Sequence, residues 1–422
     1  MSLALAGHPI SEGVKGAASL KMIIGEPDSK GSIEANLLGG LLDKFFIIES
    51  CSGVFPTAEI SFADRGGVVV DNIDRLYVGP IIYQFGYPDT SIVAHRQSHR
   101  HAMFAIRKAE LTSVVDTDSL LLDLLTRSEI SERLTVEDPV RSFGAVSASA
   151  AARLAVEADG VAIRKVEEGS DKRVYIQAQW TTVQFLRHLA QRHVSSAYGA
   201  KGAVFFFDRK DELTFGSPKW LLESGKASAV PLTFSTNPTF LAEDPSAILA
   251  WSFSSSGRLY PDRYGIGQTF KYYDAVNYAY AEVLKRLGQI KADFETSAAT
   301  AVKRLNVSRS RYIGSVVTAD DLLMDSKSLS TLVDLQVLIQ FSDQIRLGDV
   351  VDVTIPINER ANRVRTIGRG TSPVAQILES LSSYWLVSKI THFVDHGSRH
   401  YLMKLVLTRS GFGIKEPVAG LL

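Results

Sequence analysis

The feature that most constrains the fold of this 422-residue chain is a change of sequence pattern along its length. Residues 20–112 consist of short alternating polar and apolar runs separated by Gly and Pro turns, a pattern typical of antiparallel β-structure. From about 116 helical and strand patterns alternate, an aromatic-rich stretch follows, and beyond about 309 the β pattern returns. This order predicts an α+β multi-domain chain in which two β domains bracket α/β and mixed insert domains.

The two β regions carry similar strand and turn signals. In the first region, strands are predicted at 45–50 (FFIIES), 57–62 (TAEISF), 75–79, 81–85 and 102–107. In the second, a helix is predicted at 372–381 and strands at 334–341, 350–355, 384–393 and 401–409, the last two forming a long hairpin. Short strands with such turns favour small antiparallel barrels or sandwiches.

The middle of the chain predicts helices as well as strands. One helix, capped at Asp118 or Ser119, is expected to carry the leucines of 120–125, and another is expected to be capped by Thr181 or Thr182. A strand is expected at 173–177 and a β-hairpin at 203–216. A further helix is expected at 274–287, within the mixed part.

Composition excludes several classes of protein. The 46 Lys and Arg residues balance 46 Asp and Glu residues, which argues against a dedicated binder of duplex DNA. The single Cys51 can form neither an intrachain disulfide nor a thiolate zinc site. Neither a secretory signal nor a stretch of about 18 apolar residues is present, so we expect folding in a reducing compartment and no membrane span.

No group of residues predicts a catalytic, cofactor or metal site. His392, His396 and His400 are spaced by four, but Gly397 and the strand-like flanks favour a solvated hairpin turn over a metal site. Glu167–Glu168 and Asp320–Asp321 are interpreted as solvated turns, because adjacent residues do not face each other. Cys51 has no evident histidine partner, and no phosphate-binding loop or nucleophile elbow is present.

Three segments of the chain resemble the baseplate hub family of contractile-tailed phages, which includes the hub-like part of type VI secretion spike proteins. Residues 45–64 resemble the opening strands of the family's first tube-like barrel, and 181–186 with 205–209 resemble the helix and hairpin of its α/β domain. Residues 386–409 resemble its closing hairpin. The β, α/β, insert, β order of the chain adds weight to the resemblance.

The resemblance implies two tail-tube-like antiparallel β-barrels in each subunit of a homotrimer that adapts a six-fold tail tube to a three-fold central spike. The ring would enclose a passage for DNA and the tape measure protein, with non-specific passage of DNA only. The implied partners are the spike, the tail tube, baseplate wedge proteins and the tape measure protein. Its implied place is the virion tail baseplate, assembled in the bacterial host cytoplasm, without enzymatic activity, cofactor or membrane contact.

The expected domains follow from these patterns. They are an N-terminal arm (1–19), a first tube-like barrel (20–113), an α/β domain (114–227), a discontinuous second barrel (228–252 and 310–411), a mixed aromatic-rich insert (253–309) and a C-terminal tail (412–422). Partner contacts are expected at an arginine-rich loop and at the apolar tail, through Arg360, Arg363, Arg365, Arg369, Phe412, Ile414, Leu421 and Leu422. A solvated loop and a frayed terminus are the alternatives.

Two other classes of function stay open. A tail-associated peptidoglycan or polysaccharide hydrolase would need two carboxylates that face each other across the substrate, and sequence does not bring such a pair together. A glycan-binding module would use the aromatics from Trp251 to Tyr280, for which core packing is the alternative. His95, His99 and His101, with Arg96 and Arg100, form a basic patch suited to an acidic partner or a phosphate, or else an exposed loop.

Overall fold

The computed structural model describes parts of the two β regions and of the mixed region, and nearly all of the α/β region. The described residues are 6–7, 19–24, 33–36, 42–65, 81–86, 99–116, 119–128, 130–136, 139–170, 172–199, 202–234, 246–255, 266–274, 279–286, 307–313, 333–340, 342, 344–355, 381–395 and 400–409. Within these ranges, no helix is both long enough and apolar enough to cross a bilayer.

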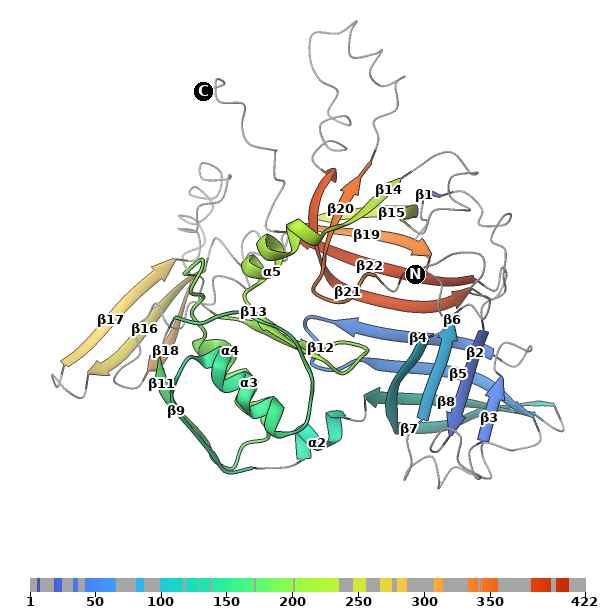
Figure 1. Ribbon diagram of the computed structural model, residues 1–422, viewed down its shortest axis with the longest axis horizontal. Helices are drawn as coiled ribbons and strands as arrows, with labels where there is room; N and C mark the ends of the chain where they lie inside the picture. The colour runs from blue at the N-terminus through green and yellow to red at the C-terminus, as the bar shows by residue number, and fades with distance from the viewer. Residues whose placement is uncertain are drawn as a thin grey trace, which may run out of the picture.

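Six strands close into a barrel (Figure 1). Each strand hydrogen-bonds to the next, and the last one returns to pair with the first, so the ring is complete. In ring order they are β20 (Val350–Thr354), β14 (Val230–Phe234), β15 (Ala247–Ser255), β19 (Val333–Gln340), β22 (His400–Arg409) and β21 (Ser383–Asp395). β14 runs parallel to both of its neighbours, and every other pair is antiparallel.

The barrel continues into a second set of strands, the extended sheet, through β21. The first part of β21 pairs with β20, whereas Lys389 to Phe393 pair with β4 (Leu42–Ser50). From β4 the extended sheet runs through β5 (Thr57–Arg65), β8 (Ser119–Ser128), β7 (His99–Asp116), β6 (Ile81–Gly86), β2 (Ser19–Ile24) and β3 (Ile33–Asn36). The short β1 (Ala6–Gly7) pairs with β15. One strand therefore belongs to both the barrel and the extended sheet.

Strand alternation explains the core. In β4 the side chains of Phe45, Ile47 and Glu49 are buried, while the intervening ones are half-buried, as expected when one face of a strand meets the core. In β19 the side chain of Leu338 is buried in a separate small cluster, and those of Leu335, Val337 and Ile339, on the opposite face, are buried in the core of the barrel. Trp385 is fully buried there, and its indole N–H donates to the carbonyl of Leu381 at 2.9 Å.

Residues 130–228 form an α/β unit with its own core. In chain order its elements are α2 (Ile130–Val136), β9 (Arg141–Val146), α3 (Ala148–Ala158), β10 (Ile163–Val166), β11 (Arg173–Gln177), α4 (Thr182–Arg192), β12 (Val204–Phe207), β13 (Leu213–Gly216), α5 (Pro218–Gly225) and the 3₁₀ turn η2 (Lys226–Ser228). β10, β13 and β12 form one sheet, and β9 pairs with β11. The buried faces of α3 and α4, rich in Ala and Leu, pack together in this core.

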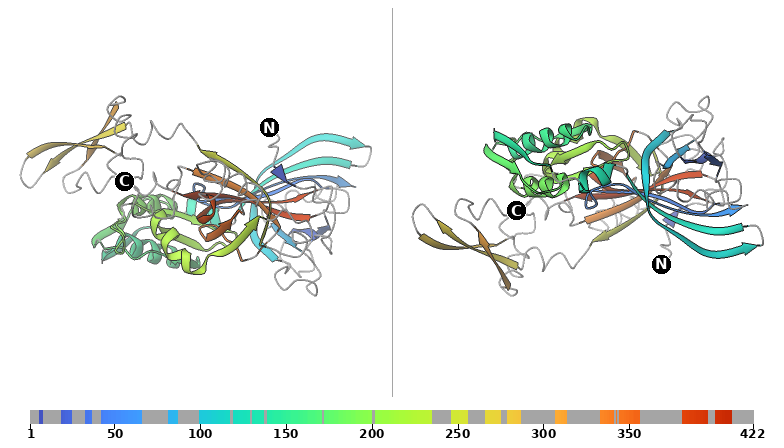
Figure 2. Two further views of the ribbon diagram at one scale, coloured as in Figure 1. Left: turned by 90° about the horizontal axis from the view of Figure 1, so that it is seen from above. Right: turned by 90° about the horizontal axis from the view of Figure 1, so that it is seen from below.

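A separate three-stranded sheet consists of β16 (Ile266–Asp274), β17 (Ala279–Arg286) and β18 (Val307–Ile313). Figures 1 and 2 show this sheet at one end of the molecule. The same views show the α/β unit and the extended sheet on different sides of the barrel.

Several predicted elements are confirmed. The strands expected at 45–50, 57–62, 81–85, 102–107, 334–341 and 350–355 lie within or largely overlap β4, β5, β6, β7, β19 and β20. The hairpin of β21 and β22 and that of β12 and β13 are present, and α4 begins after Thr181 with a complete capping box. In these places strand alternation, turn residues and the capping residue were sufficient to predict the element from the sequence.

Two predicted helices are wrong. The leucine-rich segment after Asp118 is β8, an inner strand between β5 and β7, and such strands carry continuous apolar runs that resemble a buried helix in sequence. The segment expected to be helical at 274–287 instead contains β17, because pairing with the aromatic-rich β16 overrides local helix propensity. Residues 75–79 and 372–380 lie outside the described ranges.

The fold is mostly β with few helices, and one closed barrel is seen in the described ranges. The second of the two expected barrels, in the strict sense of a closed ring, is not established, because the strands of the extended sheet follow one open path from β21 to β3. The domain boundaries stay a prediction.

Candidate functional site

The α/β unit joins the barrel through the hairpin of β12 and β13. Phe206 of β12 is fully buried in the core cluster of the barrel, whereas its neighbours Phe205 and Phe207 belong to the core of the α/β unit. Gly348, with φ +76°, precedes β20, and a Cβ atom there would lie 2.6 Å from Cζ of Phe206. A glycine is therefore required both by the backbone conformation and by the close approach of the phenyl ring.

An ion pair fixes β10 to the turn before β20. The guanidinium of Arg164 donates to both carboxylate oxygens of Asp349 at 2.6 and 2.7 Å and to the carbonyl of Leu347 at 2.7 Å. Lys165 adds a contact to Asp349 at 2.8 Å. Burial alone would raise the pKa of Asp349, but the charges of Arg164 and Lys165 hold it below its usual value. This bidentate geometry specifies orientation as well as contact.

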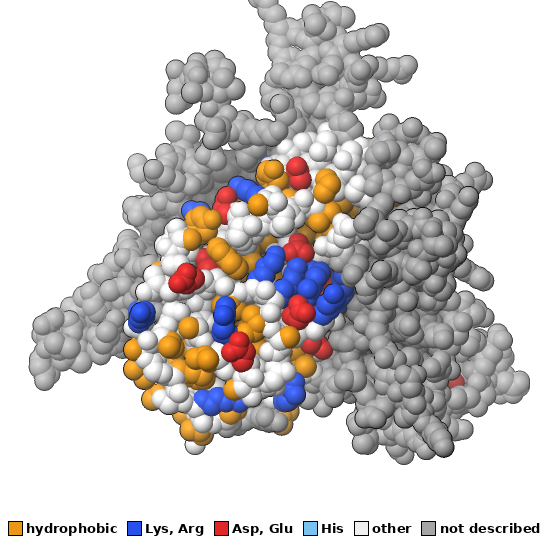
Figure 3. Space-filling view, in the orientation of Figure 1, with side chains coloured by type: hydrophobic (Ala, Val, Ile, Leu, Met, Phe, Trp, Pro, Cys, Tyr) orange, Lys and Arg blue, Asp and Glu red, His pale blue; other side chains and the backbone are white. Residues whose placement is uncertain are grey.

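A second ion pair crosses the same boundary. Arg346, in the turn before β20, contacts the carboxylates of Asp208 and Glu212 in the β12–β13 hairpin, the latter at 2.6 Å. Burial raises the pKa of Asp208 despite the nearby guanidinium. Figure 3 shows Lys and Arg side chains gathered beside Asp and Glu side chains at this boundary.

The most deeply buried charges lie where β4, β21 and the β12–β13 turn meet. Glu49 and His392 are 0% exposed and Arg209 is 2% exposed. Oε1 of Glu49 lies 2.7 Å from Nε2 of His392 and 3.8 Å from Nη1 of Arg209, and the backbone N–H of Arg209 donates to Oε2 at 2.8 Å. We call Glu49, His392 and Arg209 the buried triad.

The charge state of the buried triad follows from its surroundings. Burial would raise the pKa of Glu49, but the hydrogen bond from His392 and the charge of Arg209 lower it below its usual value. Burial, helped by the charge of Arg209, lowers the pKa of His392. At neutral pH the carboxylate is thus ionised, matched by Arg209, and accepts a hydrogen bond from a neutral imidazole.

Two predictions from the sequence, about His392 and about Glu167, are wrong. His392 does not lie in a solvated turn, because β21 extends past it and the partner strand β4 buries it. Glu167 is also buried, and it accepts hydrogen bonds from Nε2 of His193 at 2.9 Å and from the backbone N–H of Ser217 at 2.6 Å. In both cases the partner is distant in sequence, so the spacing of charged residues gave no signal.

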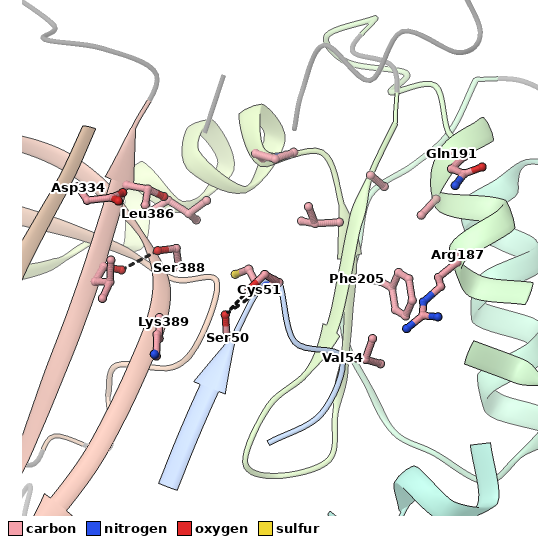
Figure 4. A pocket seen from close by; sticks show the side chains of 17 residues that line it. Ser50, Cys51, Val54, Arg187, Gln191, Phe205, Asp334, Leu386, Ser388 and Lys389 are labelled. Atoms are coloured by element: carbon pink, nitrogen blue, oxygen red, sulfur yellow. Dashed lines mark hydrogen bonds between the residues drawn. The ribbon is translucent and has the colours of Figure 1, made fainter. Parts of the chain in front are cut away.

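A cleft lies between the barrel and the α/β unit, above the β4–β5 turn (Figure 4). Its volume is about 640 Å³, within the range of ligand-binding cavities. One wall consists of barrel strands and the other of α4 and β12. The lining residues are Ser50, Cys51, Ser52, Val54, Arg187, Ala190, Gln191, Ala203, Val204, Phe205, Pro218, Asp334, Leu386, Ser388, Lys389, Val406 and Thr408. We call this space the joint cleft.

Two kinds of reactive site can be checked among the described residues, an activated thiol and a metal-binding cluster. Burial, together with the charge of Glu49, raises the pKa of the Cys51 thiol, which keeps it protonated and a poor nucleophile. Among the described side chains, no group of three or more His, Cys, Asp or Glu residues is arranged to hold a metal ion. The predicted contact residues Arg360, Arg363, Arg365, Arg369, Phe412, Ile414, Leu421 and Leu422 lie outside the described ranges, as do the side chains of His95, His99 and His101.

The fold is that of phage tail proteins, so the resemblance read from the sequence is confirmed at the level of the fold. The chain is similar to a tail protein from Neisseria meningitidis MC58, with a TM-score of 0.53 and 11% identity over 94% of this chain and 98% of that one. It is also similar to the 43 kDa tail protein of prophage MuSo2 from Shewanella oneidensis, with a TM-score of 0.52 and 12% identity over 93% and 99% of the two chains.

A chain of the half-lidded PdpA–VgrG complex of Francisella matches with a TM-score of 0.50 and 9% identity, over 95% of this chain and 59% of that one. No protein-family model matches the sequence, and no curated protein matches it. The similarity is therefore one of fold.

Proposed function

We propose that this chain is the structural hub of a phage tail baseplate, acting through its surfaces and its rigidity. The observation that carries the proposal is the similarity of fold to two phage tail proteins over nearly the full length of all three chains. In this role three copies form a ring that adapts a six-fold tail tube to a three-fold central spike. The ring encloses a channel for DNA and the tape measure protein.

The contacts between the barrel and the α/β unit support a load-bearing role. Three sets of ion pairs and the interlocked Phe206 and Gly348 cross this boundary, so the two parts are fixed in one orientation. The shared strand β21 fixes the extended sheet to the barrel in the same way. A subunit that transmits force between a tube and a spike requires such rigid connections.

The proposed arrangement uses the domains expected from the sequence. Residues 20–113 form the first tube-like barrel, residues 228–252 with 310–411 form the second, and three chains then present six such units to the tube. The arginine-rich loop at 360–369 and the apolar segment 412–422 contact neighbouring rings and the spike. The tail tube, wedge and tape measure proteins are the other partners, in the tail baseplate of a virion assembled in the host cytoplasm.

The experiment that tests the proposal is light scattering on the purified chain at several concentrations, followed by negative-stain microscopy. A mass near three times the 46.2 kDa of one chain, with three-lobed rings in the images, is the expected result. If the chain stays monomeric both alone and when mixed with the spike protein of the same tail, the hub proposal is wrong.

A further inference from the structure

The edge of β12 that faces the joint cleft has one backbone position without a partner. β12 pairs with β13 on one side only. On its other side the N–H of Ala203 donates to the carbonyl of Ala190 at 2.7 Å, and the N–H of Phe207 donates to the carbonyl of Val54 at 2.8 Å. Alternate residues of a strand direct their backbone groups to the same side, so the N–H and C=O of Phe205 also point away from β13.

Nothing in the described part of the chain bonds to the N–H of Phe205. Ala190, Val54 and Phe205 all line the joint cleft, so this N–H and C=O pair is available there. A single unpaired N–H and C=O pair, between the positions that Ala190 and Val54 already occupy, can hold one residue of a bound segment.

Two cations stand on opposite walls of the same cleft. Figure 4 shows Arg187 of α4 at one end and Lys389 of β21 at the other, with the β4–β5 turn at Cys51 between them. Neither side chain forms an ion pair or hydrogen bond with a described residue. Asp334 also lines the cleft, but it already has a partner elsewhere in the chain.

A buried hydroxyl is a further polar group of the cleft without a partner. Thr408 of β22 is only 3% exposed, lines the joint cleft, and its Oγ1 has no hydrogen-bond partner among the described residues. Buried polar groups are normally satisfied, so this hydroxyl needs a partner, and a group bound in the cleft could supply it. The rest of the lining is largely apolar, with Leu386, Val204 and Val406.

We propose that the joint cleft binds an extended polypeptide segment of a partner protein, apolar in its middle and acidic at both ends. One residue of the segment pairs with the N–H and C=O of Phe205, its apolar side chains occupy the space between barrel and α/β unit, and its carboxylates meet Arg187 and Lys389. Because Arg187 and Lys389 are both positively charged, charge complementarity requires negative charges on the partner segment. The inference does not depend on the symmetry of the assembled particle.

The test uses the full chain and a synthetic peptide, acetylated and amidated at its ends, with the sequence Asp-Val-Thr-Val-Thr-Val-Asp. Extended, its seven residues reach roughly 24 Å. The matched control peptide carries Lys in place of both Asp residues. Fluorescence anisotropy is expected to show binding of the acidic peptide that weakens with salt, and no binding of the control peptide. Hydrogen exchange is expected to slow at the amide of Phe205 when the acidic peptide is added.

The variants Arg187→Gln and Lys389→Gln are each expected to weaken binding about tenfold, because each removes a charge-assisted contact. Arg153→Gln and Lys172→Gln, exposed cations of the α/β unit outside the cleft, are the controls and are expected to leave affinity unchanged.

Equal binding of both peptides, no binding at about 1 mM, or unchanged affinity in the two cleft variants would overturn the proposal. Full competition by acetate or phosphate would assign the cleft to small anions instead. A change of oligomeric mass in the cleft variants, without an effect on peptide binding, would assign it to a second copy of the chain. Competition by small anions or a change of oligomeric mass would each also refute the proposal that the cleft binds a segment of a partner protein.

Discussion

Removing the charge of Glu49 is the most direct test of the buried triad. In Glu49→Gln the side chain keeps its shape and one acceptor oxygen, but Arg209, only 2% exposed, loses the carboxylate that balances its charge. The distance from Oε1 of Glu49 to Nη1 of Arg209 is 3.8 Å. With an effective dielectric constant of about 20, this distance corresponds to about 4 kcal/mol of attraction.

We therefore expect Glu49→Gln to lower the free energy of opening at this site by about 3–5 kcal/mol, the cost typical of breaking a buried ion pair from one side. The matched control is Glu223→Gln, which removes a surface ion pair between Glu223, 36% exposed, and Lys226, 39% exposed. Such surface pairs contribute about 0–1 kcal/mol.

The assay is native-state hydrogen exchange at the amides of β4 and β21, because a chain with several structural parts has no single free energy of unfolding. The double variant Glu49→Gln with Arg209→Met replaces the charges by neutral groups and is expected to recover most of the loss. If Glu49→Gln costs no more than Glu223→Gln, or if the double variant stays as unstable as the single one, the charge balance described above is wrong.

Three further outcomes are expected. Gly348→Ala should lower the urea midpoint followed by tryptophan fluorescence more than Gly160→Ala does, since both variants cost roughly 1–2 kcal/mol for a positive φ but only the methyl group added at position 348 meets Phe206. Equal losses would contradict the contact between position 348 and Phe206. Thr181→Ala should cost the α4 amides about 1 kcal/mol of exchange protection and Thr181→Ser should not; equal protection in both would contradict the capping box. Because folding lowers the pKa of His392, the unfolded chain binds more protons at this residue below its ordinary pKa of 6.5, so the contribution of His392 to stability should fall as pH drops from there, by at most about 1.4 kcal/mol per unit. His188, whose pKa burial lowers to about 4, adds a loss in the same pH range. His392→Gln should therefore reduce the slope above pH 5 in acid titrations of unfolding without removing the part due to His188, whereas the lowered pKa of Glu49 adds its loss only below 4.5; an unchanged slope would show that His392 does not titrate on unfolding.

Local signals in the sequence predicted the elements whose partners are near in the chain. The capping box at Thr181, the β12–β13 hairpin and the β21–β22 hairpin all depend on residues within one or two dozen positions of each other. The resemblance of these same segments to a known family led to the correct fold.

Contacts between distant segments were not predictable. Nothing near His392 reveals that Glu49 is its partner, because the two are 343 positions apart. β8 was predicted to be a helix because its continuous apolar run is not distinguished by periodicity from a buried helix, whereas the strand is paired with β5 on one side and β7 on the other. The joint cleft, likewise, is lined by seven separated segments of the chain.

The pairing of β4 with β21 has a consequence for biosynthesis. At about 5–20 residues per second, a ribosome needs roughly 17–70 s to add the residues between Glu49 and His392. During this interval β4 is made but its partner strand is not, and its edge is open to pairing with other nascent chains. The inward-facing carboxylate of Glu49 opposes such mispairing, because no foreign strand supplies the hydrogen bond of the imidazole and the charge of the guanidinium that stabilise it. Glu49 thus opposes mispairing of β4 before β21 is synthesised, and it binds His392 of β21 once that strand has been made.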